Sequence, residues 1–121
     1  MTSPQYHTDR IKTLLQKEIG WALANKVRDP RIPAIVSVTE VKLSVDGRNA
    51  TVFVGIYGDD KEKKSALFAL NRAAAYLQKI VAAAIKIKMK HFPKFYFKID
   101  TSLQESEHIE HLLKEVRDDL D

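Results

Sequence analysis

A row of basic side chains in the middle of the sequence has the spacing expected of a phosphate-binding surface. The row consists of Arg72, Lys79, Lys86 and Lys90. Steps of seven, seven and four residues would place these side chains within about 40° of one line along a straight α-helix. Ala75 and Ala83 lie on the same side, where small side chains allow a large anion to approach. A solvated face of an amphipathic helix would show the same spacing, so the row alone leaves both interpretations open.

The charge around this row has a single sign. Residues 63–99 contain nine Lys or Arg and no Asp or Glu. Exposed helices usually mix the two signs, with Glu and Lys at i, i+4 spacing. A field of one sign over so long a stretch favours a polyanionic partner, with RNA or DNA ahead of an acidic membrane surface.

The sequence lacks the residue patterns of the common enzymes and metal sites. It has no Cys, which excludes disulfides, thiolate catalysis and Cys-based zinc sites. His108 and His111 are three residues apart, but they do not form the HExxH pattern, and an exposed polar face explains them. No nucleophile elbow, Gly-rich phosphate loop or dinucleotide fingerprint occurs. We therefore expect no enzymatic activity, no metal and no cofactor.

The composition fits one compact domain with an acidic extension. The 121 residues are 45% hydrophobic, which suffices for a single core. The absence of a long apolar run and of a signal-type N-terminus predicts a cytoplasmic protein. Residues 1–104 hold 18 basic and 9 acidic residues, whereas residues 105–121 hold 2 basic and 7 acidic residues. We expect a basic domain over residues 1–104 and a separate acidic helix or tail over residues 105–121.

The first half of the sequence predicts a helix and a β-hairpin. Apolar residues at helical spacing predict a helix that begins between residues 3 and 8 and ends before Pro30. Residues 34–44 and 48–57 predict two strands joined by a turn at Asp46-Gly47. The apolar alternation changes phase within the first strand, which predicts a bulge near residue 39 or 40.

The second half predicts the long helical region that carries the basic row. This region begins near residue 60 and reaches about His91 without Gly or Pro, which is long for one helix, so we expect a break in it. Its apolar stripe should face the sheet through Leu70, Leu77 and Val81. Residues 94–100 alternate and predict a third strand. The fold class is therefore α+β, with a last amphipathic helix that starts near Gln104.

One face of the predicted sheet should remain open to solvent. Its aromatic side chains are Phe53, Tyr57 and Tyr96, beside Lys94 and Lys98. Such rings can stack on RNA bases. Cross-strand aromatic pairs that only stabilise an open face are commoner, so this face is the weaker candidate for RNA binding.

Short motifs from about Tyr6 to Glu115 keep the order that they have in one protein family. They are Arg28-Asp29-Pro30-Arg31, Val38-Thr39-x-Val41, Leu43-Ser44-x-Asp46-Gly47, Ala50-x-Val52, Ala69-Leu70-Asn71, Tyr76-Leu77, Pro93, Phe97-x-x-Asp100-x-Ser102, Ile109 and Leu112-Leu113. Each motif is weak alone, but together they are specific. On these residues the chain resembles the ribosome-binding factor A family of bacterial small-subunit assembly factors.

The resemblance implies a single type II KH-like domain of order α-β-β-α-kink-α-β, followed by the C-terminal amphipathic helix. The family carries Ala-x-Gly at the kink, and the matching positions here are Ala73, Ala74 and Ala75, so Ala replaces the Gly. The expected RNA-binding residues are therefore Arg31, Arg72, Ala73, Ala74, Ala75, Lys79, Lys86 and Lys90.

The resemblance also implies a function without catalysis. It predicts a monomer that binds the free, immature 30S subunit and its 16S rRNA and assists late maturation and rRNA processing. No small-molecule substrate, cofactor or membrane is implied. The alternative is a structural KH module that stays in its particle, as a ribosomal protein does.

Overall fold

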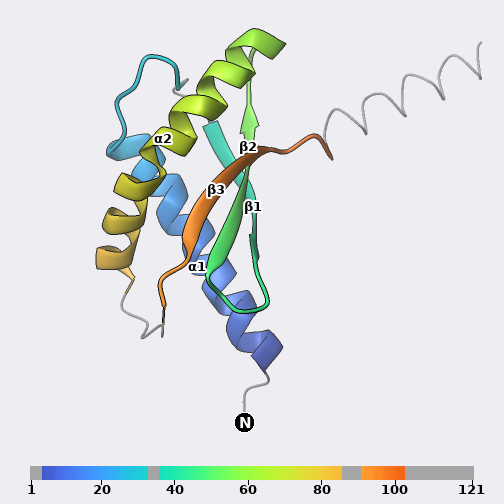
Figure 1. The fold of residues 1–121 in the computed structure, drawn as a ribbon, viewed down its shortest axis with the longest axis vertical. Helices are drawn as coiled ribbons and strands as arrows, with labels where there is room; N and C mark the ends of the chain where they lie inside the picture. Colours follow the sequence, from blue (N-terminus) through green and yellow to red (C-terminus); the bar gives the residue numbers. More distant parts are fainter. Residues whose placement is uncertain (1–3, 33–35, 86–90, 103–121) are drawn as a thin grey trace, which may run out of the picture.

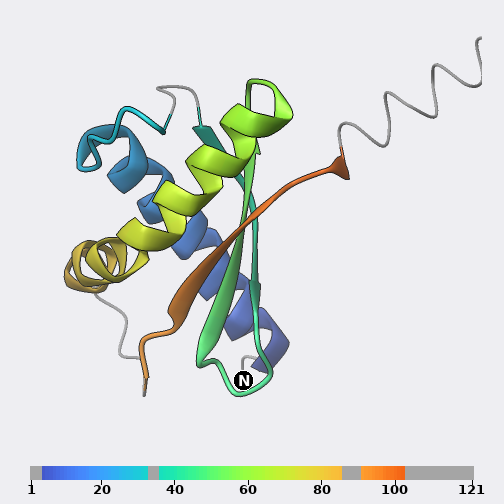
Figure 2. The ribbon, with the colours of Figure 1, turned by 45° about the horizontal axis from the view of Figure 1, so that its top comes forward.

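The computed structural model describes residues 4–32, 36–85 and 91–102, and within them the chain is an α+β fold. The elements are α1 (Pro4–Asn25), β1 (Val36–Leu43), β2 (Asn49–Ile56), α2 (Asp60–Ala84) and β3 (Lys94–Ile99). The strands form one sheet in the order β1-β2-β3, and both helices lie on one side of it (Figures 1 and 2). The helix expected from near Gln104 lies outside the described residues. None of the described helices is long and apolar enough to cross a membrane.

The β1–β2 hairpin confirms the predicted bulge. The strands are antiparallel, and their register shifts between Val38 and Glu40. The shift keeps apolar residues on the core side before and after it. Gln16 of α1 donates from Nε2 to the carbonyl oxygen of Val38 at 3.1 Å, so α1 binds the backbone at the irregularity. The turn lies where predicted, and Gly47 has a φ of 72°, a conformation that favours glycine.

β3 runs parallel to β2, so the sheet is mixed. Parallel neighbours need a crossover connection, and α2 provides it. Two α2 side chains also bind the backbone of β3. Asn71 accepts from the Phe97 N–H at 2.9 Å, and Gln78 accepts from the Phe95 N–H at 3.1 Å. These bonds satisfy strand groups that would otherwise face outward from the edge of the sheet.

The core lies between the two helices and the covered face of the sheet. Leu70, Leu77 and Val81 of α2 are fully buried in one cluster with Val52 and Val54 of β2. The predicted inward side of the helix is therefore confirmed. Because this side is fixed against the sheet, the opposite side of α2 must face solvent.

α2 differs from the expected helix in two respects. It is one helix without a break, because Ala73, Ala74 and Ala75 are strong helix formers where a Gly would weaken the helix. It bends rather than breaks, and Figures 1 and 2 show its second half running at an angle to its first. It ends at Ala84, since Ile85 has extended backbone angles, and residues 86–90 of the helical region expected up to about His91 lie outside the described residues.

Candidate nucleic-acid interface

The solvent-facing side of α2 carries the basic residues of the predicted row that the structure describes. Arg72, Ala75 and Lys79 are all exposed, and Ala75 follows Arg72 by one turn of the helix. We call this region the α2 surface, defined by Phe68, Arg72, Ala75, Tyr76, Lys79 and Ala83. It presents cations on either side of small side chains, which is the arrangement that the sequence predicts.

The alanines at the centre of α2 do not share one environment. Ala75 is exposed and Ala73 is half-buried, whereas Ala74 is only 8% exposed and belongs to the core cluster. Neighbouring positions on a helix point about 100° apart, so Ala74 faces the core while Ala75 faces solvent. Of the three alanines expected at the interface, Ala75 is the one whose side chain a ligand reaches most easily.

The remaining cations of the predicted row, Lys86 and Lys90, lie outside the described residues. α2 ends at Ala84, so the helical spacing that would align all four side chains does not extend to them. The alignment argument therefore holds for Arg72 and Lys79 alone.

Arg31 comes to the α2 surface from the segment between α1 and β1. The Cζ of Arg31 lies 5.8 Å from the centre of the Phe68 ring, and the Cζ of Arg72 lies 5.9 Å from the same point. Two of the predicted RNA-binding residues, 41 positions apart in the printed sequence, thus meet at one aromatic ring. The sequence-based prediction did not include Phe68, although an aromatic residue on the polar side of an amphipathic helix is a signal that could have identified it.

Asp29 fixes the position of Arg31. Its carboxylate accepts hydrogen bonds from Nη2 of Arg31 at 2.7 Å and from Nε at 3.0 Å, and from the Arg31 backbone N–H at 2.9 Å. These hydrogen bonds, chiefly the side-chain ones, lower the pKa of Asp29 to about 2, with a smaller contribution from the charge of Arg72. The carboxylate is therefore ionised at neutral pH, and the guanidinium group is held in place.

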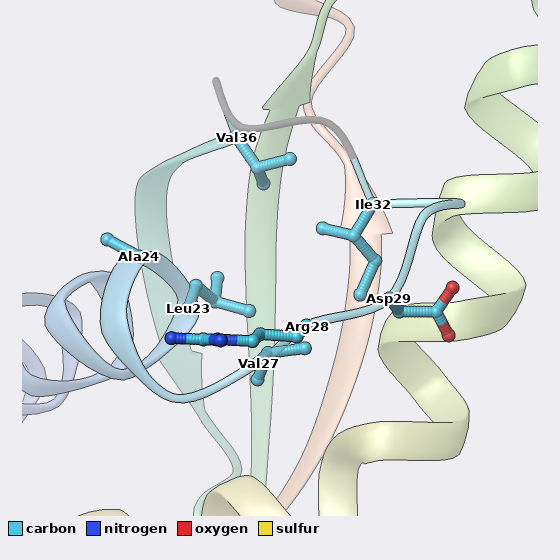
Figure 3. A pocket seen from close by; sticks show the side chains of 7 residues that line it. All are labelled: Leu23, Ala24, Val27, Arg28, Asp29, Ile32 and Val36. Carbon is cyan, nitrogen blue, oxygen red and sulfur yellow. The ribbon is translucent and has the colours of Figure 1, made fainter.

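A cavity lies beside this segment, at the end of α1 (Figure 3). It has a volume of about 270 Å³ and is lined by Leu23, Ala24, Val27, Arg28, Asp29, Ile32 and Val36. Figure 3 shows the Arg28 side chain extending along Leu23, and the Asp29 carboxylate turned away from the cavity toward α2. Five of the seven lining residues are apolar, and the other two are Arg28 and Asp29.

The open face of the sheet also carries aromatic and basic residues. Tyr96 is 49% exposed, and the Nζ of Lys42 lies 5.3 Å from the centre of the Phe53 ring. Phe53 pairs with Lys98 on one side and with Glu40 on the other, so an acidic residue occupies the same row. We call this region the open sheet face, defined by Glu40, Lys42, Thr51, Phe53, Lys94, Tyr96 and Lys98.

The described part of the chain offers no metal-binding cluster. None of its groups brings together three or more His, Asp or Glu side chains that could hold a metal ion. His108 and His111 lie outside the described residues. Among the described residues of the predicted interface, Arg31, Arg72 and Lys79 carry the positive charges that can attract an anion.

Comparison with known proteins identifies relatives of the whole fold. The family profile described as Ribosome-binding factor A matches residues 7–113. The protein of this description from Thermomicrobium roseum is 38% identical over 114 residues, which cover 94% of this chain and 86% of that protein. Its counterpart from Halothermothrix orenii is 39% identical over 110 residues, which cover 91% of this chain and 88% of that protein.

Solved structures agree with the sequence relatives. The crystal structure of ribosome-binding factor A from Thermus thermophilus is similar to this chain with a TM-score of 0.65 and 25% identity, covering 76% of this chain and 94% of that chain. A second similar structure is a homology model of the Thermus thermophilus factor fitted into the cryo-EM map of a 30S complex. Its TM-score is 0.54 at 28% identity, and the match covers 73% of this chain and 93% of that chain.

Proposed function

The chain belongs to the ribosome-binding factor A family, and from this premise we propose that it binds the immature 30S ribosomal subunit through the 16S rRNA. In this role it assists late maturation of the subunit and processing of its rRNA. It acts by binding rather than by catalysis, as a cytoplasmic monomer without a cofactor or a small-molecule substrate. The similarity to a factor fitted into a 30S complex supports the choice of partner.

The observation that carries this proposal is the uniform charge of the α2 surface. α2 has acidic residues only in its first turn, at Asp60 and Glu62, and the rest of the helix contains only basic charges. Phosphate contacts supply most of the affinity and position a protein on RNA without reading its sequence. A surface of one sign on a helix whose other side is locked into the core is suited to that task.

Individual residues have distinct parts in the proposed interface. Arg72 and Lys79 bind phosphates, and Ala75 between them allows the RNA backbone to approach the helix. Arg31 binds a further phosphate from the neighbouring segment. Ala73 and Ala74 contribute backbone shape, and Lys86 and Lys90 extend the basic row beyond the described end of α2.

The proposed fold is a type II KH-like domain. The order α1-β1-β2-α2-β3, the mixed sheet and the bend in α2 support it. In this proposal the bend at the alanine segment replaces the kink between two helices that the family carries. The exposed Ala75 then stands where the family has Gly, and its small side chain preserves the close approach of the RNA.

Sedimentation of cell extracts tests the proposed function against its alternative. An assembly factor should sediment with free 30S subunits and be missing from mature ribosomes and polysomes. A structural ribosomal protein would remain in both. Recovery of the protein in polysomes at the level of a ribosomal protein would overturn the proposal. A double variant, Arg72→Ala with Lys79→Ala, should shift from the 30S fractions to the top of the gradient.

A further inference from the structure

Phe68 occupies a position that the packing of the fold does not explain. Its side chain is 58% exposed, although it stands on a helix whose inner side is fully buried. It does not belong to the core cluster or to the partly buried residues packed against that cluster. An aromatic ring that is this exposed contributes little to the core, so its contacts at the surface indicate its role.

Two guanidinium groups hold this ring from separate parts of the chain. Arg72 reaches it from the next turn of α2, and Arg31 reaches it from the segment after α1. Cation–π attraction favours both contacts. Asp29 accepts from Nε and Nη2 of Arg31, and no acceptor among the described residues binds Nη1, which can donate to a ligand. Asp29 therefore anchors Arg31 beside the ring, and Arg72 contacts the same ring from its own helix.

This arrangement fits the chemistry of one nucleotide. An aromatic ring offers a stacking surface to a base, and a guanidinium group offers paired donors to a phosphate. Bases inside a duplex are covered by their neighbours, so only an unpaired base can reach the ring. We propose that Phe68, Arg31 and Arg72 form a binding site for one unpaired nucleotide, whose base stacks on the exposed part of the Phe68 ring between phosphates bound by the two arginines.

The proposed site rests on the proposed RNA-binding function and makes it more specific. Arg72 and Lys79 alone would bind paired and unpaired RNA alike, because phosphates occur in both. A stacking ring adds a preference for single-stranded regions. The site also requires the segment of Arg31 and the helix of Arg72 to act together, which positions the RNA over the first half of α2.

The test compares single-stranded and double-stranded RNA in a binding assay with purified protein. The probes are a labelled strand of about 12 nucleotides, within the site sizes of single-strand-binding folds, and the same strand annealed to its complement. Phe68→Leu removes the ring and keeps an apolar side chain at an exposed position, so the fold should persist, as circular dichroism will check. Phe68→Tyr keeps the ring, and Tyr96→Leu is the matched control on the open sheet face.

We expect Phe68→Leu to weaken binding of the single strand by about 5- to 150-fold, the usual contribution of one stacked base. Duplex binding should stay within about twofold, since the stacking step is not used there. Phe68→Tyr should restore the single-strand affinity, and Tyr96→Leu should leave it unchanged. The salt dependence should be the same for Phe68→Leu as for the original protein, because no charge is lost.

Other outcomes would overturn the site, and they separate it from the proposed function. If Phe68→Leu binds the single strand normally while Lys79→Ala binds it weakly, the stacking site is wrong and the basic surface stands. An equal loss for single and double strands would mean that Phe68 only positions the arginines. A loss for Tyr96→Leu in place of Phe68→Leu would move stacking to the open sheet face. Normal binding by both Phe68→Leu and Lys79→Ala would overturn both proposals.

Discussion

The α2 surface and the open sheet face both combine cations with aromatic rings, but they differ in how the charges are arranged. On the α2 surface, Arg72 and Lys79 are separated by the small Ala75, and the acidic Asp29 is already engaged with Arg31. On the open sheet face, Glu40 stands in one row with Phe53 and Lys98. Among the residues that define each surface, a polyanion therefore meets only basic charges on the α2 surface and both signs of charge on the open sheet face.

The two surfaces are alike in what holds them in place. The α2 surface is the outward side of a helix whose inward side is fully buried and whose Asn71 and Gln78 bind the backbone of β3. The open sheet face is the outward side of strands whose inward side chains are buried in the same cluster. Binding residues on such a support keep their positions when a ligand approaches, which reduces the entropy lost on binding. Aromatic and basic residues alone therefore do not distinguish the proposed RNA-binding surface from the open sheet face. Charge of one sign distinguishes the helix from the sheet.

The largest expected effect concerns the support of the α2 surface. Replacing the fully buried Leu77 with Ala should lower the free energy of unfolding by about 2–5 kcal/mol, because it leaves a cavity between α2 and the sheet. Tyr96→Ala on the open sheet face should lower it by less than about 1 kcal/mol. Urea denaturation of both variants measures the difference. Equal losses would mean that Leu77 does not pack in the core between α2 and the sheet.

The next prediction places a negative charge on each surface in turn. Ala75→Glu adds a carboxylate between Arg72 and Lys79, where RNA should come closest. Like-charge repulsion at a binding surface costs several kcal/mol, so the affinity for 30S subunits should fall by at least about 100-fold. Thr51→Glu adds the same charge beside Lys42 on the open sheet face and should change the affinity little. A larger loss for Thr51→Glu would reverse the comparison.

Salt dependence distinguishes the cations of the two surfaces. Each phosphate contact adds about 0.7–0.9 to the slope of log affinity against log salt, so Arg72→Ala with Lys79→Ala should reduce the slope by about 1.5. The matched pair on the sheet, Lys94→Ala with Lys98→Ala, removes the same charge and should leave the slope unchanged. The measurement is RNA binding over a salt series. If both double variants reduce this slope equally, the number of basic side chains determines RNA binding and their position on the protein does not.

A smaller effect is expected from the acidic C-terminal segment. Deleting residues 105–121 removes 7 acidic and 2 basic residues. Because carboxylates repel phosphate, the shortened protein should bind RNA with equal or higher affinity. Fluorescence anisotropy with labelled RNA measures the change. A clear loss of affinity in a shortened protein that remains folded would place an RNA contact in this segment and weaken the assignment to α2.

The smallest effect concerns pH. The pKa of Asp29 is lowered to about 2 in the folded state, so its ion pair with Arg31 adds stability above the unfolded pKa near 4 and loses it as the pH falls toward 2. Because Asp29 stays ionised between pH 5 and pH 8, its titration should not change RNA binding at the α2 surface in this range. Thermal denaturation from pH 5 to pH 2 should show a steeper loss of stability for the original protein than for Asp29→Asn. Identical curves would show that the ion pair does not support Arg31.

The parts of the fold that depend on neighbouring residues could be predicted from the sequence. The phase change between Val38 and Val41 located the bulge, and Asp46-Gly47 located the turn. The helical spacing of Leu70 and Leu77 identified the buried side of α2. These features follow from local geometry, since each depends on residues a few positions apart.

The parts of the fold that depend on contacts between distant segments could not be predicted from the sequence. Arg31 and Phe68 meet because the segment after α1 passes beside α2, and no spacing within either segment indicates this. In the sequence, Asn71 and Gln78 do not differ from other polar residues of a helix. Their hydrogen bonds to the backbone of β3 are evident only in the structure. The expected break in α2 relied on typical helix lengths, whereas the helix-forming alanines at 73–75 kept it continuous.

Photo-crosslinking tests most directly the claim that the α2 surface binds the RNA of the 30S subunit. The protein bound to free 30S subunits is irradiated, digested with trypsin, and the peptides that carry crosslinked nucleotides are identified by mass spectrometry. We predict crosslinks in residues 65–72, which contain Phe68 and Arg72, and in residues 73–79, which contain Ala75 and Lys79. Crosslinks confined to residues 95–98 and to the peptide that contains Phe53 would contradict the claim and place the RNA on the open sheet face.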